Sequence, residues 1–84
     1  MLTVEEIKLV DCAEALFASA VATGTPVTTT ELNLTIAQTM LARGGAAGCA
    51  AAMATAYGEN PAHAAERMRW ALRVLNNERD EVTA

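Results

Sequence analysis

Two breaks bracket an alanine-rich segment, and they constrain this chain more than any other feature. The first break is Gly44-Gly45, the second runs from Gly58 to Pro61, and residues 46–57 lie between them. Each glycine costs about 1 kcal/mol relative to alanine inside a helix, so a pair of glycines most simply ends one. Gly58 is expected to cap the segment, and Asn60-Pro61 supplies an N-cap and a proline at the first helical position. The pattern predicts a chain that turns sharply twice.

Start and stop signals elsewhere predict the remaining helix ends. Thr3 and Glu6 form a capping box at the start of a first helix. Thr23-Gly24-Thr25-Pro26 ends that helix, because glycine accepts a left-handed cap and proline cannot continue the hydrogen-bond ladder. Thr28 and Glu31 form a second capping box. The predicted helices cover residues 4–22, 29–43, 46–57 and 61–79.

Apolar residues recur with a helical period in these segments. The first helix has an apolar face wide enough for more than one neighbour. In the second helix, the predicted core-facing residues are Leu32, Ile36, Met40, Ala37 and Leu41. In the last helix they are Ala64, Met68, Ala71, Leu72 and Leu75. The sequence predicts an all-α single domain, a small compact bundle of three long helices plus one short connecting helix.

The size and composition of the chain favour association with a second molecule. The 84 residues are 52% hydrophobic but only 4% aromatic, so the core must be built largely from Ala, Leu, Val and Met. Such a core gives a marginal monomer, and small scaffolds without disulfides or metals commonly gain stability by oligomerisation. We therefore expect a homodimer or a complex with a protein partner.

Charge and hydropathy limit the functions to consider. The net charge of −4 argues against broad, sequence-independent attraction to phosphate. The opening residues MLTVEEIKLVD carry acids where a signal peptide carries positive charges, and no apolar run reaches the roughly 18 residues of a membrane span. We expect a cytoplasmic protein without membrane contact. Its abundant alanine, with arginine preferred over lysine, is typical of GC-rich bacterial genomes.

The segment of residues 46–79 resembles a helix-turn-helix in the order and spacing of its helices. Met53, Ala54, Tyr57 and Gly58 match the apolar, small, apolar and glycine positions of that motif. The small residue allows two helices to cross closely, and the glycine turns the chain. A helix-turn-helix transcriptional regulator is therefore one hypothesis, set against a structural helical hairpin.

Reading DNA also requires hydrogen-bond donors along the exposed start of the last helix. Only His63 is available there, while Arg67, Arg69 and Arg73 lie farther along and could reach the DNA backbone. Glu66 lies among them and would repel phosphate. The candidate nucleic-acid contacts are His63, Arg69 and Arg73.

Trp70 has two interpretations. It falls beside the inward stripe of the last helix, so its indole is either a lid over the core or an exposed anchor. Tryptophan and arginine are the residues that most often carry binding energy in interfaces. If Trp70 is an anchor, the partner-binding patch consists of Arg67, Trp70, Arg73 and Val74.

Cys12 and Cys49 are expected to be reduced, ordinary thiols of the core or its boundary. A disulfide, or a metal site that adds His63 and Glu66, is the alternative, but the spacing matches no known ligand motif. No nucleophile, base and orienting group are evident together, and no glycine-rich phosphate motif occurs. We expect no catalytic residue, metal, cofactor or small-molecule ligand. The sequence favours a non-catalytic interaction or regulatory module, and it leaves open whether Gly44-Gly45 is also a hinge.

Overall fold

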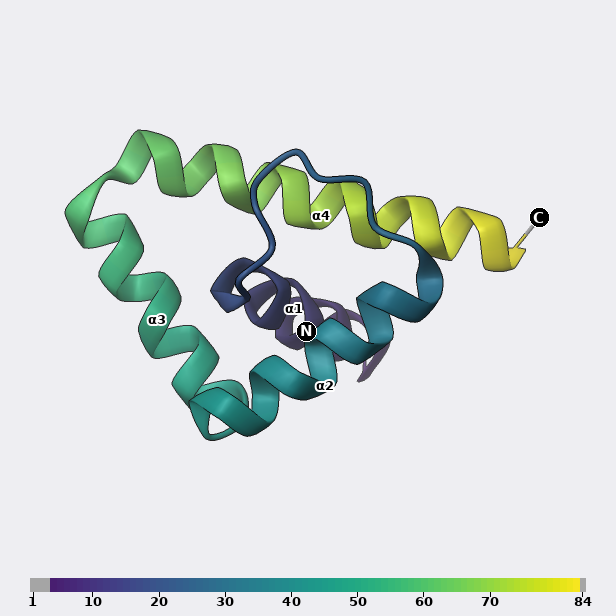
Figure 1. The fold of residues 1–84 in the computed structure, drawn as a ribbon, viewed down its shortest axis with the longest axis horizontal. Coiled ribbons are helices and arrows are strands. Elements are labelled where there is room, and N and C mark those ends of the chain that lie inside the picture. Colours follow the sequence, from purple (N-terminus) through teal and green to yellow (C-terminus); the bar gives the residue numbers. More distant parts are fainter. Residues whose placement is uncertain (1–3, 84) are drawn as a thin grey trace.

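Four helices make up the protein in a computed structural model that describes the backbone of residues 4–83 and the side chains of residues 8–77 (Figure 1). They are α1 (Val4–Ala18), α2 (Thr29–Arg43), α3 (Ala46–Glu59) and α4 (Pro61–Thr83). No strand occurs within residues 4–83, which confirms the all-α prediction, and α3 is the shortest helix with 14 residues. None of the helices described has the length and hydropathy needed to cross a lipid bilayer. The capping box predicted at Thr3 lies outside the described residues.

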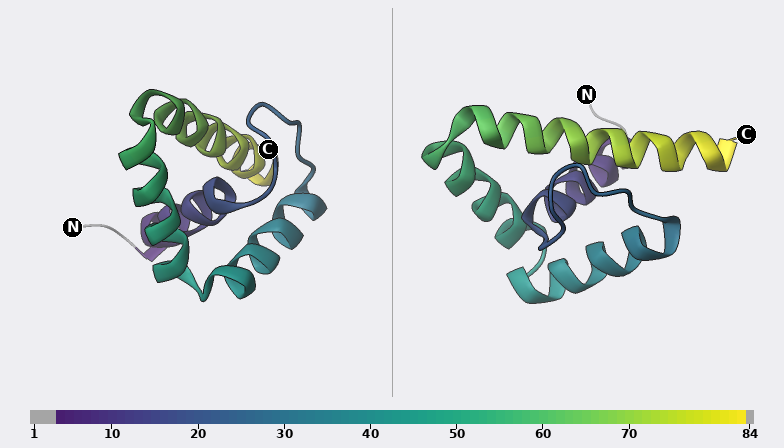
Figure 2. Two further views of the ribbon diagram at one scale, coloured as in Figure 1. Left: turned by 60° about the vertical axis from the view of Figure 1, so that its left-hand side comes forward. Right: turned by 45° about the horizontal axis from the view of Figure 1, so that its top comes forward.

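The first helix is the centre of the fold. α1 packs against α2, α3 and α4, which surround it in the two views of Figure 2. Its last turns are closed off from solvent, and the buried residues there are Ala13, Ala15, Leu16, Phe17 and Ala18. The C-terminal half of the apolar face of α1 is therefore covered by three helices of its own chain, whereas Val10, nearer the start of the helix, is 45% exposed.

The core consists of two clusters of different character. The larger side chains gather in one cluster, formed by Ala13, Leu16, Leu32, Trp70, Ala71 and Leu75. The second cluster is built from small side chains, namely Ala15, Ala18 and Cys49, with Ile36, Met40 and Ala52 packed against them. Small residues let helix backbones approach closely while keeping the interior tightly packed. The alanine-rich composition of α3 thus serves its packing against α1.

The glycine pair ends α2 as predicted. Gly44 and Gly45 have φ angles of 82° and 87°, in the region that glycine adopts without the steric penalty of a side chain. The Gly45 N–H donates to the Met40 carbonyl at 2.7 Å, which satisfies one of the free carbonyls at the helix end. The Gly45 carbonyl then accepts from the Cys49 N–H at 3.1 Å and opens α3.

The second break lies at Asn60 and not at Gly58. Gly58 continues α3, which ends at Glu59, so the predicted glycine cap is wrong. The Asn60 N–H closes α3 by donating to the Ala56 carbonyl at 3.0 Å. Its side-chain oxygen accepts from the His63 N–H at 3.1 Å and caps α4, which confirms the start predicted there. α4 continues to Thr83, four residues beyond the predicted end.

α1 ends at Ala18, four residues earlier than the predicted residue 22. The cause is Ser19, whose hydroxyl donates to the Leu16 carbonyl at 2.7 Å and accepts from the Val21 N–H at 3.3 Å. A serine side chain that bonds the local backbone competes with continuation of the helix. At the start of α2, the Thr28 hydroxyl accepts from the Glu31 N–H at 3.2 Å, which confirms the N-cap.

Candidate interaction surface

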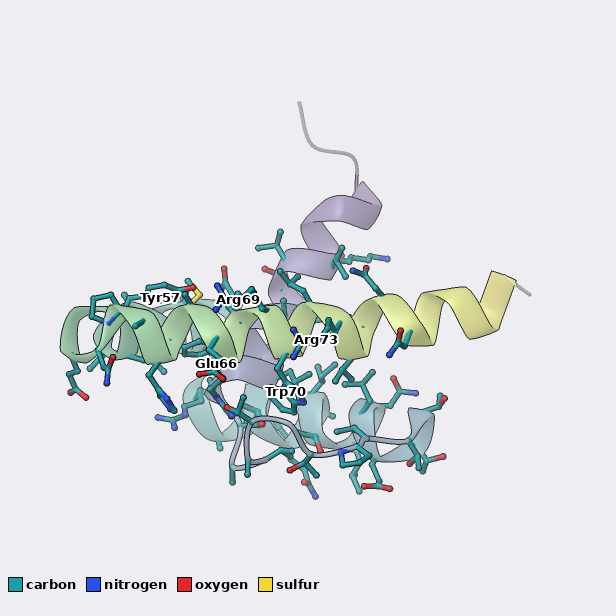
Figure 3. All side chains as sticks on the ribbon, turned by 90° about the horizontal axis from the view of Figure 1, so that it is seen from above. Tyr57, Glu66, Arg69, Trp70 and Arg73 are labelled. Carbon is teal, nitrogen blue, oxygen red and sulfur yellow. The ribbon has the colours of Figure 1, made fainter. Side chains whose placement is uncertain are left out.

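Trp70 belongs to the core. Its side chain is 3% exposed, and its indole N–H donates to the Thr25 carbonyl at 3.3 Å. Figure 3 shows it on the side of α4 along which the loop between α1 and α2 runs. Val74 is half-buried against the same cluster. The interpretation as an exposed anchor is therefore wrong, and the alternative of a tryptophan in the core is confirmed.

Arg67 is also turned inward, onto the C-terminal end of α1. Its Nε–H donates to the Phe17 carbonyl at 2.8 Å, and two other nitrogens donate to the Ser19 carbonyl at 2.9 Å and the Thr23 hydroxyl at 3.0 Å. The guanidinium carbon lies 5.1 Å from the centre of the Trp70 ring. Burial lowers the pKa of Arg67.

These contacts give Arg67 a structural role. The last carbonyls of a helix lack partners within it and carry partial negative charge, so a guanidinium placed there is favourable. Arg43 adds a second donor at the same end of α1, to the Ala18 carbonyl at 3.3 Å. Of the predicted partner patch, only Arg73 is exposed.

The candidate nucleic-acid contacts do lie on the surface. His63, Arg69 and Arg73 are all exposed on α4, and the two arginines are one turn apart. Figure 3 shows both on the side of α4 that faces the viewer. Glu66, also exposed, lies about one turn before Arg69 and two turns before Arg73, and it adds negative charge to the same region.

The turn before α4 departs from the helix-turn-helix pattern. Gly58 does not turn the chain, because it lies inside α3, and only Asn60 separates the two helices. Ala54, expected at a close helix crossing, is exposed. Tyr57 is half-buried and stacks on Phe17 with a ring-centre distance of 5.9 Å. Of the residues that suggested the motif, Tyr57 therefore packs α3 against α1, whereas Ala54 and Gly58 do not form the close crossing and the turn that the motif requires.

Both cysteines are free thiols. Cys49 is 0% exposed, whereas Cys12 is half-buried. Burial raises the pKa of both thiols. The charge of Asp11 adds to the rise in the pKa of Cys12, whereas at Cys49 Arg43 opposes the rise in pKa and Glu14 and Asp11 add to it. In the described part of the chain, no three His, Cys, Asp or Glu side chains gather in a way that could hold a metal ion.

We expect Cys12 to react with a disulfide reagent such as dithiobis-nitrobenzoate at least about tenfold faster than Cys49 near pH 8, because Cys49 must wait for local opening. Rates measured on Cys12→Ser and Cys49→Ala chains test this, with equal rates in denaturant as the control. Equal reaction rates of the two thiols in the native protein would contradict the burial of Cys49.

Folding raises the pKa of both thiols, which affects the pH dependence of stability. The stabilisation that comes from these two shifts is complete below about pH 8.5, and it is lost as the pH rises through the pKa values of the folded state.

α2 exposes an apolar stripe, which we call the leucine face and define as Leu34, Ala37, Gln38 and Leu41. Leu34 is 56% exposed and Leu41 is 86% exposed. At 100° per residue, the two leucines lie within about 20° of each other around the helix. Ala37 and Gln38 lie between them along the helix axis and within about 60° of Leu34 on either side. The prediction that Ala37 and Leu41 point into the core is therefore wrong.

The leucine face carries no charge. No acidic or basic residue occurs between Glu31 and Arg43. The core-facing residues Leu32, Ile36 and Met40 occupy the other side of α2, so this helix is apolar on two faces. A sequence signal for the second face exists in the seven-residue spacing of Leu34 and Leu41, which is two helical turns.

An open groove of about 430 Å³ adjoins the leucine face. It lies between α2 and the chain that leaves α1, and its lining residues are Ala18, Ser19, Ala20, Val21, Thr35, Gln38, Thr39, Ala42 and Arg43. Gln38 belongs to both the groove and the leucine face. The two features therefore form one continuous surface of mostly small and uncharged side chains.

Comparisons with protein-family models, with curated proteins and with solved structures find no match. Function is therefore inferred from the surfaces of this chain alone. Two surfaces stand out among the described residues: the leucine face with its groove, and the arginine-bearing side of α4.

Proposed function

We propose that this protein is a non-catalytic helical interaction module that self-associates through the leucine face of α2. The observation that carries the proposal is the 86% exposure of Leu41 beside Leu34 on a stripe without charges. Single exposed leucines are common on protein surfaces, but paired ones on an uncharged helix face are typical of a contact site. Burying each leucine contributes about 1.5–3 kcal/mol.

The overall charge of the chain favours this face for a second copy. Each copy has a net charge of −4, so two copies repel each other in most orientations. The repulsion is smallest where neither contacting surface carries charge. The stretch from Leu32 to Ala42 meets that condition. A contact of one helix face per copy falls at the low end of interface sizes, below about 1,200 Å². The association is therefore expected to be reversible and to depend on concentration.

DNA binding by the arginine-bearing side of α4 has less support. Arg69 and Arg73 are exposed and could contact phosphates. Arg67, however, is occupied at the end of α1, and Glu66 lies on the same part of α4. Its test is the salt dependence of binding to duplex DNA, which should fall when Arg69 and Arg73 are replaced by alanine.

Sedimentation velocity over a wide concentration range tests the proposal. We expect the wild-type chain to shift reversibly from monomer to dimer, and Leu41→Gln to weaken the dimer at least about tenfold, since each copy loses a buried leucine. The matched control is Leu72→Gln, a leucine of α4 with an exposed fraction of 36%. Circular dichroism checks that both variants keep their helices. Equal weakening by the two substitutions, or a wild-type chain that stays monomeric, would contradict the proposal.

A further inference from the structure

The two leucines of α2 are placed symmetrically about the middle of the leucine face. Leu34 and Leu41 are seven residues apart, which is about 10.5 Å along the helix, and Ala37 and Gln38 occupy the centre. We infer that a second copy binds antiparallel across this face, with a two-fold axis passing between Ala37 and Gln38. This inference rests on the proposed self-association and specifies its geometry.

The antiparallel arrangement makes the face self-complementary. With the axis at the centre, Leu34 packs against Leu41 of the partner subunit, and Leu41 packs against Leu34 of the partner subunit. A two-fold interface requires this kind of reciprocal contact, in which the same patch serves both copies. The small Ala37 side chain at the centre lets the two helices approach closely.

The helix dipole of α2 favours the antiparallel orientation over the parallel one. An antiparallel copy brings the partly positive N-terminal end of one α2 beside the partly negative C-terminal end of the other. A parallel copy would place like ends of the dipoles together. The charged residues of α2, Glu31 and Arg43, add little to this preference, because Arg43 lies on the opposite side of the helix from the leucine face and donates to the Ala18 carbonyl at 3.3 Å.

The groove enlarges the surface that a second helix covers. Gln38 lies at the centre of the leucine face and also lines the groove, and Ala42 lines the groove one turn farther along. A helix laid over the leucine face therefore also reaches the mouth of the groove. This brings the contact nearer to the size that a specific dimer needs.

Four double variants test the orientation while removing the same two leucines. Leu34→Glu with Leu41→Lys, and Leu34→Lys with Leu41→Glu, place opposite charges against each other in an antiparallel dimer. Glu at both positions, or Lys at both, places like charges together. We expect the two mixed variants to associate at least about tenfold more tightly than both like-charged variants in sedimentation at low salt. Because both Glu/Glu and Lys/Lys are included, the net charge of the chain does not explain this order.

Each outcome bears on a different part of the inference. A wild-type chain that stays monomeric overturns both the self-association and its geometry. A wild-type dimer that all four variants preserve overturns the leucine face as the contact. If the mixed variants are as weak as the like-charged ones, but associate when the two mixed variants are combined, the helices pair parallel and the antiparallel geometry is wrong.

Discussion

Replacing Arg67 with methionine is expected to lower the free energy of unfolding by about 2–4 kcal/mol. The substitution keeps most of the apolar stem but removes the guanidinium, which leaves the carbonyls of Phe17 and Ser19 and the hydroxyl of Thr23 without this donor. It also removes the cation from its position 5.1 Å from the Trp70 ring centre. Urea titration followed by circular dichroism measures the loss.

The matched control is Arg69→Met, two positions away on the exposed side of the same helix. Its expected effect is within about 0.5 kcal/mol, as for most surface substitutions. Arg67→Lys should fall between wild type and methionine, because lysine keeps the charge but cannot reach several acceptors with a planar fork. Equal stability of the Arg67→Met and Arg69→Met chains would show that the end of α1 does not depend on Arg67.

Replacing Gly48 with alanine is expected to cost about 3 kcal/mol or more, because the added Cβ has no space. That atom would overlap the carbonyl oxygen of Arg43 and lie 2.6 Å from its carbonyl carbon. The obstacle is backbone, so no side-chain rotation relieves it. The turn at Gly44-Gly45 would have to open, and α3 would shift relative to α2.

Gly58→Ala gives the opposite expectation and serves as the comparison. Gly58 is helical, and a Cβ placed there meets nothing within 4 Å. Alanine should therefore stabilise the protein by about 0.5–1 kcal/mol, through helix propensity and a less flexible unfolded chain. Thermal unfolding of both variants measures the difference. A Gly48→Ala chain as stable as Gly58→Ala would contradict the tight approach of α2 and α3.

Local signals were sufficient to predict the architecture. Gly44-Gly45, Asn60-Pro61 and Thr28 with Glu31 each act through backbone geometry or hydrogen bonds within a few residues, so their effects can be seen in the sequence. The prediction at Gly58 was wrong because a glycine can remain inside a helix. Here Pro61, three residues later, sets the start of the next helix.

The long-range contacts that determine which side chains of α2 and α4 are exposed could not be predicted in this way. Arg67 lies 50 residues after Phe17, and no periodicity reveals which carbonyls a distant arginine will reach. α2 has apolar residues on two sides, so the choice between burying Met40 or Leu41 depends on how the other helices pack against it. Ser19 shortened α1 through a side-chain hydrogen bond that periodicity does not register.

The position of α1 at the centre has a consequence for how the protein is made. α1 is translated before α2 and α4, yet the arginines that close its end belong to those two helices. A nascent chain therefore leaves the ribosome with its central helix uncovered, and folding must wait until α4 has been translated. Translation that stops before residue 67 yields a product that cannot complete its core, and cellular proteases should remove it instead of leaving a stable fragment.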